Sequence, residues 1–166
     1  MKRIAVSSCL LGSPVRYDGT HRASHHTMAI CSEDDIECVS FCPEQVLGTP
    51  RPPIEYVWVP NEPPDVVEIE TGRSVLGTLQ DSVDRIAWDL MAQPLHGIIC
   101  KSRSPSCALL DARYKTADLE NSQLGPGLFI LTMQERMPGI PIIDDLGLID
   151  SVKRADFLHA VRSEQE

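Results

Sequence analysis

The stretch LQDSVDRIAWDLMAQPLHGIICK, residues 79–101, predicts a surface helix followed directly by a buried strand. Its apolar side chains recur at the spacing that places them on one face of a 3.6-residue helix. They are Leu79, Val83, Ile86, Ala87, Leu90 and Met91. Pro94 ends the helix because proline has no N–H to donate to it. The apolar run GIICK, residues 97–101, then has the length of a strand buried on both faces.

Strands and helices alternate along the rest of the chain as well. Further strands are predicted at Arg3–Ser7, Cys38–Phe41, Ile54–Val59, Val66–Glu70 and Ile140–Ile143. Further helices are predicted at Arg22–Ser32, Gly127–Met137 and Asp150–Arg162, with Asp150 as the cap of the last. Such alternation favours a parallel sheet covered on both faces. We therefore expect an α/β fold: a single three-layer α/β/α (Rossmann-like) domain over residues 1–166 with a mostly parallel sheet.

Length and composition exclude several classes of protein. The 166 residues are 42% hydrophobic, which suits one globular domain with a substantial core. No apolar run is long enough to span a bilayer, and the N-terminal run is too short for a secretory signal. The net charge of −9 disfavours a large nucleic-acid surface, which needs clustered cations. We expect a cytoplasmic protein without a membrane partner; its oligomeric state is not fixed by the sequence.

The six cysteines carry most of the chemical information. With no secretory signal and a core of this size, we expect them to be reduced. Cys9, Cys42 and Cys107 each follow a predicted strand, at the edge where parallel sheets bind ligands. Their wide separation differs from the C-x-x-C pairs of structural zinc modules. Soft thiolates select iron–sulfur or zinc centres, and three of them on an open edge would leave one iron of a four-iron cluster exposed.

Other candidate residues are interpreted as structural. Cys31, Cys38 and Cys100 are expected to be packed as small hydrophobic side chains. Three histidines are clustered at His21, His25 and His26. Only His21 and His25 have the i, i+4 spacing of a helical zinc pair, and this pair lacks a third ligand. The acidic runs Glu33–Glu37 and Glu62–Glu70 are expected to be solvated surface.

The segments around the three cysteines resemble the thiouracil desulfidase family, formerly domain of unknown function 523. The motifs occur in order as CLLG with RYDG (9–12 and 16–19), CPE followed by glycine and TPRPP (42–53), and KSRSPSC (101–107). The resemblance covers the chain from Cys9 to the strand Ile140–Ile143. It implies a [4Fe-4S] cluster on Cys9, Cys42 and Cys107. The iron without a protein ligand would bind the sulfur of a thiolated pyrimidine base such as 2-thiouracil, which is hydrolysed to uracil and sulfide.

The resemblance also implies Glu44 and Ser104 as catalytic groups. An exposed iron is a thiophilic Lewis acid, and the water that attacks the C=S carbon needs a base. Glu44 could act as base and proton donor if burial raises its pKa. Ser104 could relay a proton or orient the base. We further expect Arg51 and Lys101 to bind a carbonyl of the base or a negative intermediate.

The chain departs from the family pattern near the expected pocket, and these departures leave alternative functions open. Ala108 replaces a glycine, and residues 109–125, LLDARYKTADLENSQLG, lack a tyrosine–aspartate–glycine turn. The link from CPE to PR is also shorter than in the family. One alternative is a non-catalytic metal-binding or redox-sensing module on structural zinc. Others are a desulfidase acting on another thiocarbonyl compound, or on thiolated tRNA, which the acidic charge balance disfavours.

Overall fold

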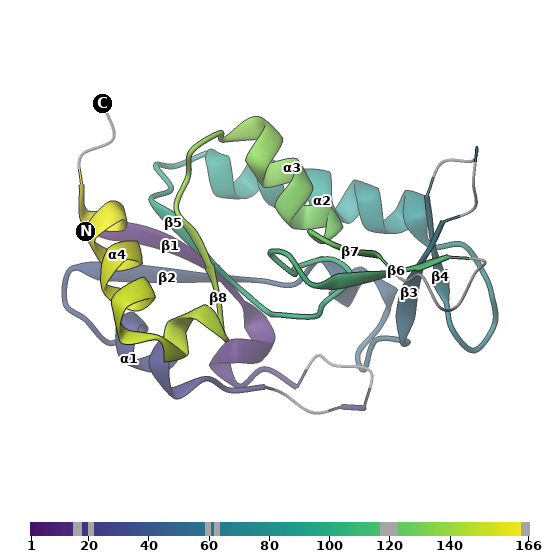
Figure 1. The fold of residues 1–166 in the computed structure, drawn as a ribbon, viewed down its shortest axis with the longest axis horizontal. Helices are drawn as coiled ribbons and strands as arrows, with labels where there is room; N and C mark the ends of the chain where they lie inside the picture. Colours follow the sequence, from purple (N-terminus) through teal and green to yellow (C-terminus); the bar gives the residue numbers. More distant parts are fainter. Residues whose placement is uncertain (15–17, 20–21, 59–60, 62–63, 117–122, 164–166) are drawn as a thin grey trace.

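The computed structural model describes residues 1–14, 18–19, 22–58, 61, 64–116 and 123–163 (Figure 1). Its helices are α1 (His25–Cys31), α2 (Leu76–Met91), α3 (Leu128–Arg136) and α4 (Ser151–Arg162). Three short 3-10 helices are η1 (Ser8–Leu11), η2 (Pro43–Leu47) and η3 (Gly147–Ile149). Among these described residues, no helix is long and apolar enough to cross a lipid bilayer.

The first sheet is entirely parallel and lies at the centre of the layered part of the molecule. Its strands, in the order β2-β1-β5-β8, are Ile36–Phe41, Lys2–Ser7, Gly97–Cys100 and Ile142–Asp144. Successive side chains of β1 point to opposite faces: Ala5 packs with α2 and α3, whereas Ile4 and Val6 pack with α1 and α4. Both faces are therefore covered, as Figure 1 shows, and the expected three-layer α/β/α fold is confirmed.

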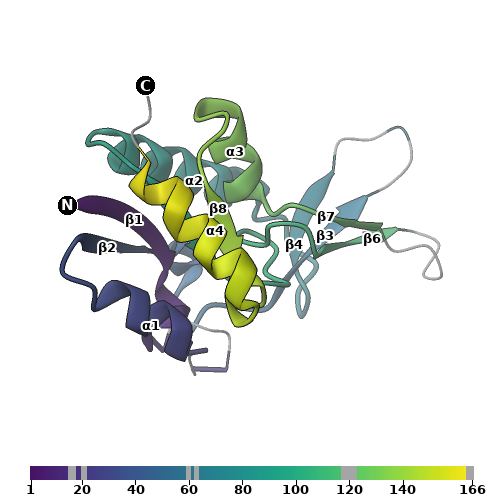
Figure 2. The same cartoon turned by 60° about the vertical axis from the view of Figure 1, so that its left-hand side comes forward.

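A second sheet lies beside the first (Figure 2). Its strands, in the order β4-β3-β6-β7, are Asp65–Glu68, Ile54–Trp58, Ala112–Thr116 and Gln123–Gly125. Only β3 and β6 run parallel; the other two pairs are antiparallel. The sequence pattern did not predict β6 and β7, because Arg113 and Lys115 interrupt any apolar run there. The two sheets pack on separate hydrophobic clusters, and the cluster of the second includes Tyr56, Val66 and Ala112.

The predicted elements are found with small shifts of their ends. The helix predicted to begin at Leu79 begins at Leu76, and the strand predicted to begin at Ile140 begins at Ile142. Asp150 caps α4 as expected, since its Oδ1 accepts hydrogen bonds from the N–H groups of Val152 and Lys153. His21 and Val59 lie outside the described residues.

Two expectations are corrected by the structure. Cys31 and Cys38 are not reduced thiols but form a disulfide, because the last residue of α1 packs beside the middle of β2. Cys100, in contrast, is a buried thiol as predicted. The second acidic run is not wholly solvated: Glu68 is buried, and its carboxylate accepts hydrogen bonds from Arg73 and Thr71.

Candidate metal–sulfur site

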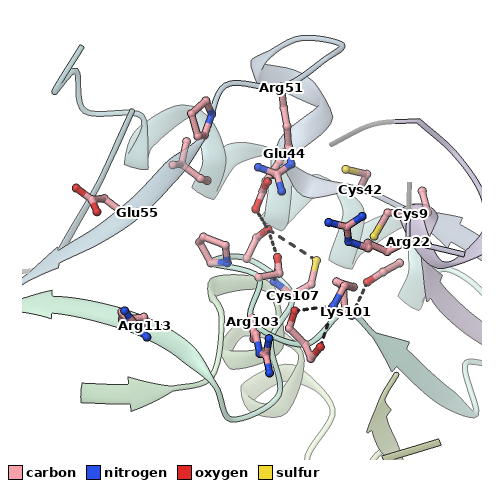
Figure 3. Close-up of a pocket in the computed structure, with 18 of the residues that line it drawn as sticks. Cys9, Arg22, Cys42, Glu44, Arg51, Glu55, Lys101, Arg103, Cys107 and Arg113 are labelled. Carbon is pink, nitrogen blue, oxygen red and sulfur yellow. Dashed lines mark hydrogen bonds and ion pairs between the residues drawn. The ribbon is translucent and has the colours of Figure 1, made fainter. Parts of the chain in front are cut away.

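A cavity of about 760 Å³ opens at the carboxyl ends of β1, β2 and β5 and extends towards the second sheet. Cys9, Cys42 and Cys107 all line it. Figure 3 shows the three side chains grouped around one hollow, although they come from distant segments. The structure thus brings together the three cysteines that the strand-end argument selected. Their role as ligands stays a prediction.

The order of the strands explains this convergence. Cys9 lies in η1 directly after β1, and Cys42 follows β2 and precedes η2. Cys107 lies in the turns after β5. Because β2, β1 and β5 are neighbours with the same direction, their carboxyl ends lie side by side.

The described residues contain no group of three or more His, Cys, Asp or Glu side chains that could hold a metal ion.

The turn that carries Cys107 is held in place by Ser104, which belongs to the same turn, and by the start of α3. Ser104 Oγ accepts the N–H of Cys107 at 3.1 Å, and the carbonyl of Ser106 accepts the N–H of Phe129 at 2.8 Å. Gly127 approaches so closely that a Cβ there would lie 2.5 Å from the carbonyl carbon of Ser106. Only glycine fits between α3 and this turn.

Glu44 is a buried carboxylate at the wall of the cavity, only 2% exposed. Ser106 Oγ donates a hydrogen bond to its Oε1 at 2.5 Å, and Arg51 Nε forms an ion pair with its Oε2. Arg51 forms this ion pair and also lines the cavity, and its expected contact with substrate stays a prediction. Ser104, expected as a catalytic partner, caps the Cys107 turn, and its Oγ lies 3.5 Å from that of Ser106. Sequence reasoning missed Ser106 because nothing in KSRSPSC distinguishes its serines.

Cys42, which is half-buried, and Cys107, which is buried, are hard to ionise on their own. Desolvation, followed by the negative charge of Glu44, raises the pKa of Cys42 from 9.0 to about 11. Desolvation also raises the pKa of Cys107 well above its usual range, although hydrogen bonds from Ser106 and Ser7 oppose this. Such thiols become thiolates at neutral pH when a positive centre binds them.

Lys101 is held in the loop after β5. Its ammonium group donates to Ser102 O at 3.1 Å, Ser102 Oγ at 2.8 Å and Asp145 Oδ2 at 3.1 Å. Asp145 Oδ1 in turn accepts the N–H of Ser102 at 2.7 Å. Lys101 therefore connects the loop after β5 to Asp145 at the end of β8. The contact of Lys101 with a substrate base stays a prediction.

The rim of the cavity is rich in cations that the sequence did not single out. Arg22, Arg103 and Arg113 line it, and no carboxylate among the described residues forms an ion pair with their guanidinium groups. Lys115 also lines it and pairs with Glu55 at 3.2 Å. These basic residues are scattered through the sequence and gather only in the fold. Their positive charges lie at the rim, whereas the negative charge of Glu44 acts on Cys42 and Cys107 deeper in the cavity.

The chain is similar to known proteins over most of its length. Residues 4–145 match the 2-thiouracil desulfurase family. The uncharacterized protein YbbK of Bacillus subtilis (strain 168) is 34% identical over 114 residues, which cover 63% of this chain and 72% of YbbK. The solved structure of the [4Fe-4S]-dependent thiouracil desulfidase TudS superposes with a TM-score of 0.71 at 28% identity, covering 94% of this chain and 99% of that one. The chain belongs to the 2-thiouracil desulfurase family.

Proposed function

We propose that this protein is a [4Fe-4S]-dependent desulfidase that removes sulfur from a thiolated pyrimidine base such as 2-thiouracil, giving uracil and sulfide. The observation that carries the proposal is the convergence of Cys9, Cys42 and Cys107 on one cavity beside the buried carboxylate of Glu44. Family membership and the similarity to TudS support the same reaction class.

The thiol chemistry of the site suits the proposed cofactor, although the described residues contain no group of three or more His, Cys, Asp or Glu side chains already placed to hold a metal ion. Three thiols without a fourth cysteine at the cavity would hold three irons, and the cavity is large enough for a cluster and a small base. The raised pKa values mean that Cys42 and Cys107 are protonated at neutral pH in the absence of metal, so binding to iron would have to displace their protons and would be favoured by higher pH. When bound, the cluster would supply a thiophilic Lewis acid for the sulfur of the substrate.

The residues of the chain supply the proton transfers and the positioning. Glu44 would accept a proton from the water that attacks the C=S carbon and return a proton as the C–S bond breaks. Ser106 and Arg51 fix the two carboxylate oxygens, so that Glu44 presents one orientation to the cavity. The guanidinium groups of Arg22 and Arg103 line the cavity and would stabilise negative charge on the reacting base and the departing sulfide.

Anaerobic reconstitution with iron and sulfide tests the proposal. We expect about four iron and four sulfide ions per chain and the release of uracil and sulfide in equal amounts from 2-thiouracil. Replacing Cys9, Cys42 or Cys107 by serine should abolish loading. Cys100→Ser is the matched control, since Cys100 is a buried thiol of β5 that does not line the cavity, and it should load normally. A fully loaded protein that releases no sulfide from any thiolated base would contradict the proposed reaction.

The cationic rim favours a second candidate substrate within the same reaction class. Arg22, Arg103 and Arg113 face a cavity that is larger than a free base needs, and guanidinium groups bind oxyanions well. A thiolated base that carries an anionic substituent such as phosphate would use them. Comparing kcat/KM for 2-thiouracil and for the corresponding thiolated nucleotide distinguishes the two, because only the nucleotide should lose efficiency in the Arg113→Gln variant.

A further inference from the structure

The short helix α1 joins two of the three cysteine-bearing loops. On its N-terminal side, the N–H of Arg22 donates to Cys9 O at 2.9 Å and the N–H of Ser24 donates to Leu10 O at 3.0 Å. Ser24 also caps α1 by accepting the N–H of Thr27. The start of the helix is thus tied to the backbone of η1, which carries Cys9.

The other end of α1 is tied to the sheet by a covalent bond. Cys31 is the last residue of the helix, and its disulfide joins Cys38 in β2, whose final residue directly precedes Cys42. Cys31 and Cys38 are both half-buried, so small reagents can reach them. They pack against the same hydrophobic cluster as Cys9, Leu10 and Ile30.

A helix of seven residues has little stability of its own, so its attachments decide whether it stays in place. The disulfide closes a loop of the chain with a sequence separation of seven residues and removes conformational freedom from it. Without the bond, α1 would be held by Ile30, by its contacts with η1, η3 and β2, and by the hydrogen bond between His26 and Arg154. Local opening of α1 would then release the backbone that fixes Cys9.

We propose that Cys31 and Cys38 form a redox-active dithiol that latches α1 onto β2 and thereby holds the Cys9 loop in place. The oxidant is a low-molecular-weight disulfide. One cysteine thiolate attacks it, forms a mixed disulfide and releases one small thiol; the second cysteine thiolate then displaces the other small thiol. The two cysteines are oxidised, the small disulfide is reduced to two thiols, and the two cysteine protons end on the released thiols.

Thiol counting tests the redox half of the proposal on the full-length chain. The protein is equilibrated with oxidised or with reduced glutathione, denatured and alkylated, and the added mass is measured. Since the chain has six cysteines, we expect six alkylated thiols after reduction and four after oxidation, with residues 31 and 38 recovered as one cross-linked peptide. Six thiols under both conditions would overturn the proposal.

The structural half is tested by the rate at which Cys9 is alkylated in the native, iron-free chain. We expect reduction of the wild-type disulfide to raise that rate on the order of tenfold, because local opening becomes easier. The Cys31→Ser/Cys38→Ser double variant should match the reduced protein, and Cys100→Ser should match the oxidised one. An unchanged rate of Cys9 alkylation after reduction of the disulfide would contradict the proposal that the disulfide holds the Cys9 loop in place. Neither measurement uses turnover or a cluster, so failure of the latch and failure of the proposed desulfidase activity are distinguishable.

Discussion

At the scale of single residues, Glu44 is the side chain on which the proposed chemistry depends most. Its carboxylate is bound by Ser106 and Arg51 yet still lines the cavity. Glu44→Gln keeps the shape but removes the proton acceptor, so sulfide release from the iron-loaded protein should fall on the order of 100-fold. Glu55→Gln is the control, since Glu55 also lines the cavity but pairs with Lys115. Equal sulfide release by the two variants would contradict the proposed role of Glu44 as proton acceptor.

Ser106 and Ser104 can be separated by parallel alanine substitutions. Ser106→Ala removes the donor to Glu44, and we expect kcat to fall about tenfold with little change in KM or iron content. Ser104→Ala removes the acceptor for the N–H of Cys107, so it should reduce iron retention more than it reduces the turnover of loaded protein. A larger loss of kcat in Ser104→Ala than in Ser106→Ala would indicate that Ser104 is the catalytic serine. Steady-state kinetics and iron analysis on both variants decide between them.

The sequence predicted which cysteines line the cavity, but not which polar groups accompany them. Cys9, Cys42 and Cys107 follow strands whose direction is deducible from the alternation of elements, so their common edge could be foreseen. The partner of Glu44 depends on how one turn packs under α3, which no local pattern encodes. The Cys31–Cys38 bond was missed for a different reason, namely that the thiols were expected to be reduced.

At the scale of elements, the contact between α3 and the Cys107 turn should tolerate no side chain at Gly127. A Cβ at Gly127 would lie 2.8 Å from Cys107 N as well as inside contact distance of Ser106. Gly127→Ala should therefore lower the thermal midpoint and the iron content together, because the turn must move away from the cavity. In Gly77→Ala, by contrast, the Cβ would meet nothing within 4 Å in α2, and the higher helix propensity of alanine should stabilise the protein slightly. Thermal unfolding and iron analysis of the two variants check this contrast.

Predictability also differs between the two sheets. The parallel strands and α2 have long apolar patterns that identify them without knowledge of their neighbours. β6 and β7 are short and largely polar, and they become strands because β6 pairs with β3 and β7 with β6. Their strand character is a property of the sheet rather than of their own residues.

At the scale of the whole molecule, the structure predicts a loss of stability in acid. Hydrogen bonds from Arg73 and Thr71 hold the pKa of Glu68 below its ordinary value of 4.5. A carboxyl group whose folded-state pKa is lowered stabilises the protein above that ordinary value, and the stabilisation is lost as the pH falls through the folded-state pKa. Urea unfolding at neutral and at acidic pH should therefore show a smaller loss of stability in Glu68→Gln than in the wild type. Parallel curves for the two proteins would contradict this.

The placement of the three cavity cysteines after neighbouring parallel strands has a consequence for biosynthesis. Parallel neighbours pair only after the intervening crossover has been made, and here the third thiol is residue 107 of 166. A nascent chain that has emerged only as far as η2 presents Cys9 and Cys42 but not Cys107. The proposed cluster would therefore be completed only after residue 107 has been synthesised, because all three proposed ligands are present only from that point on.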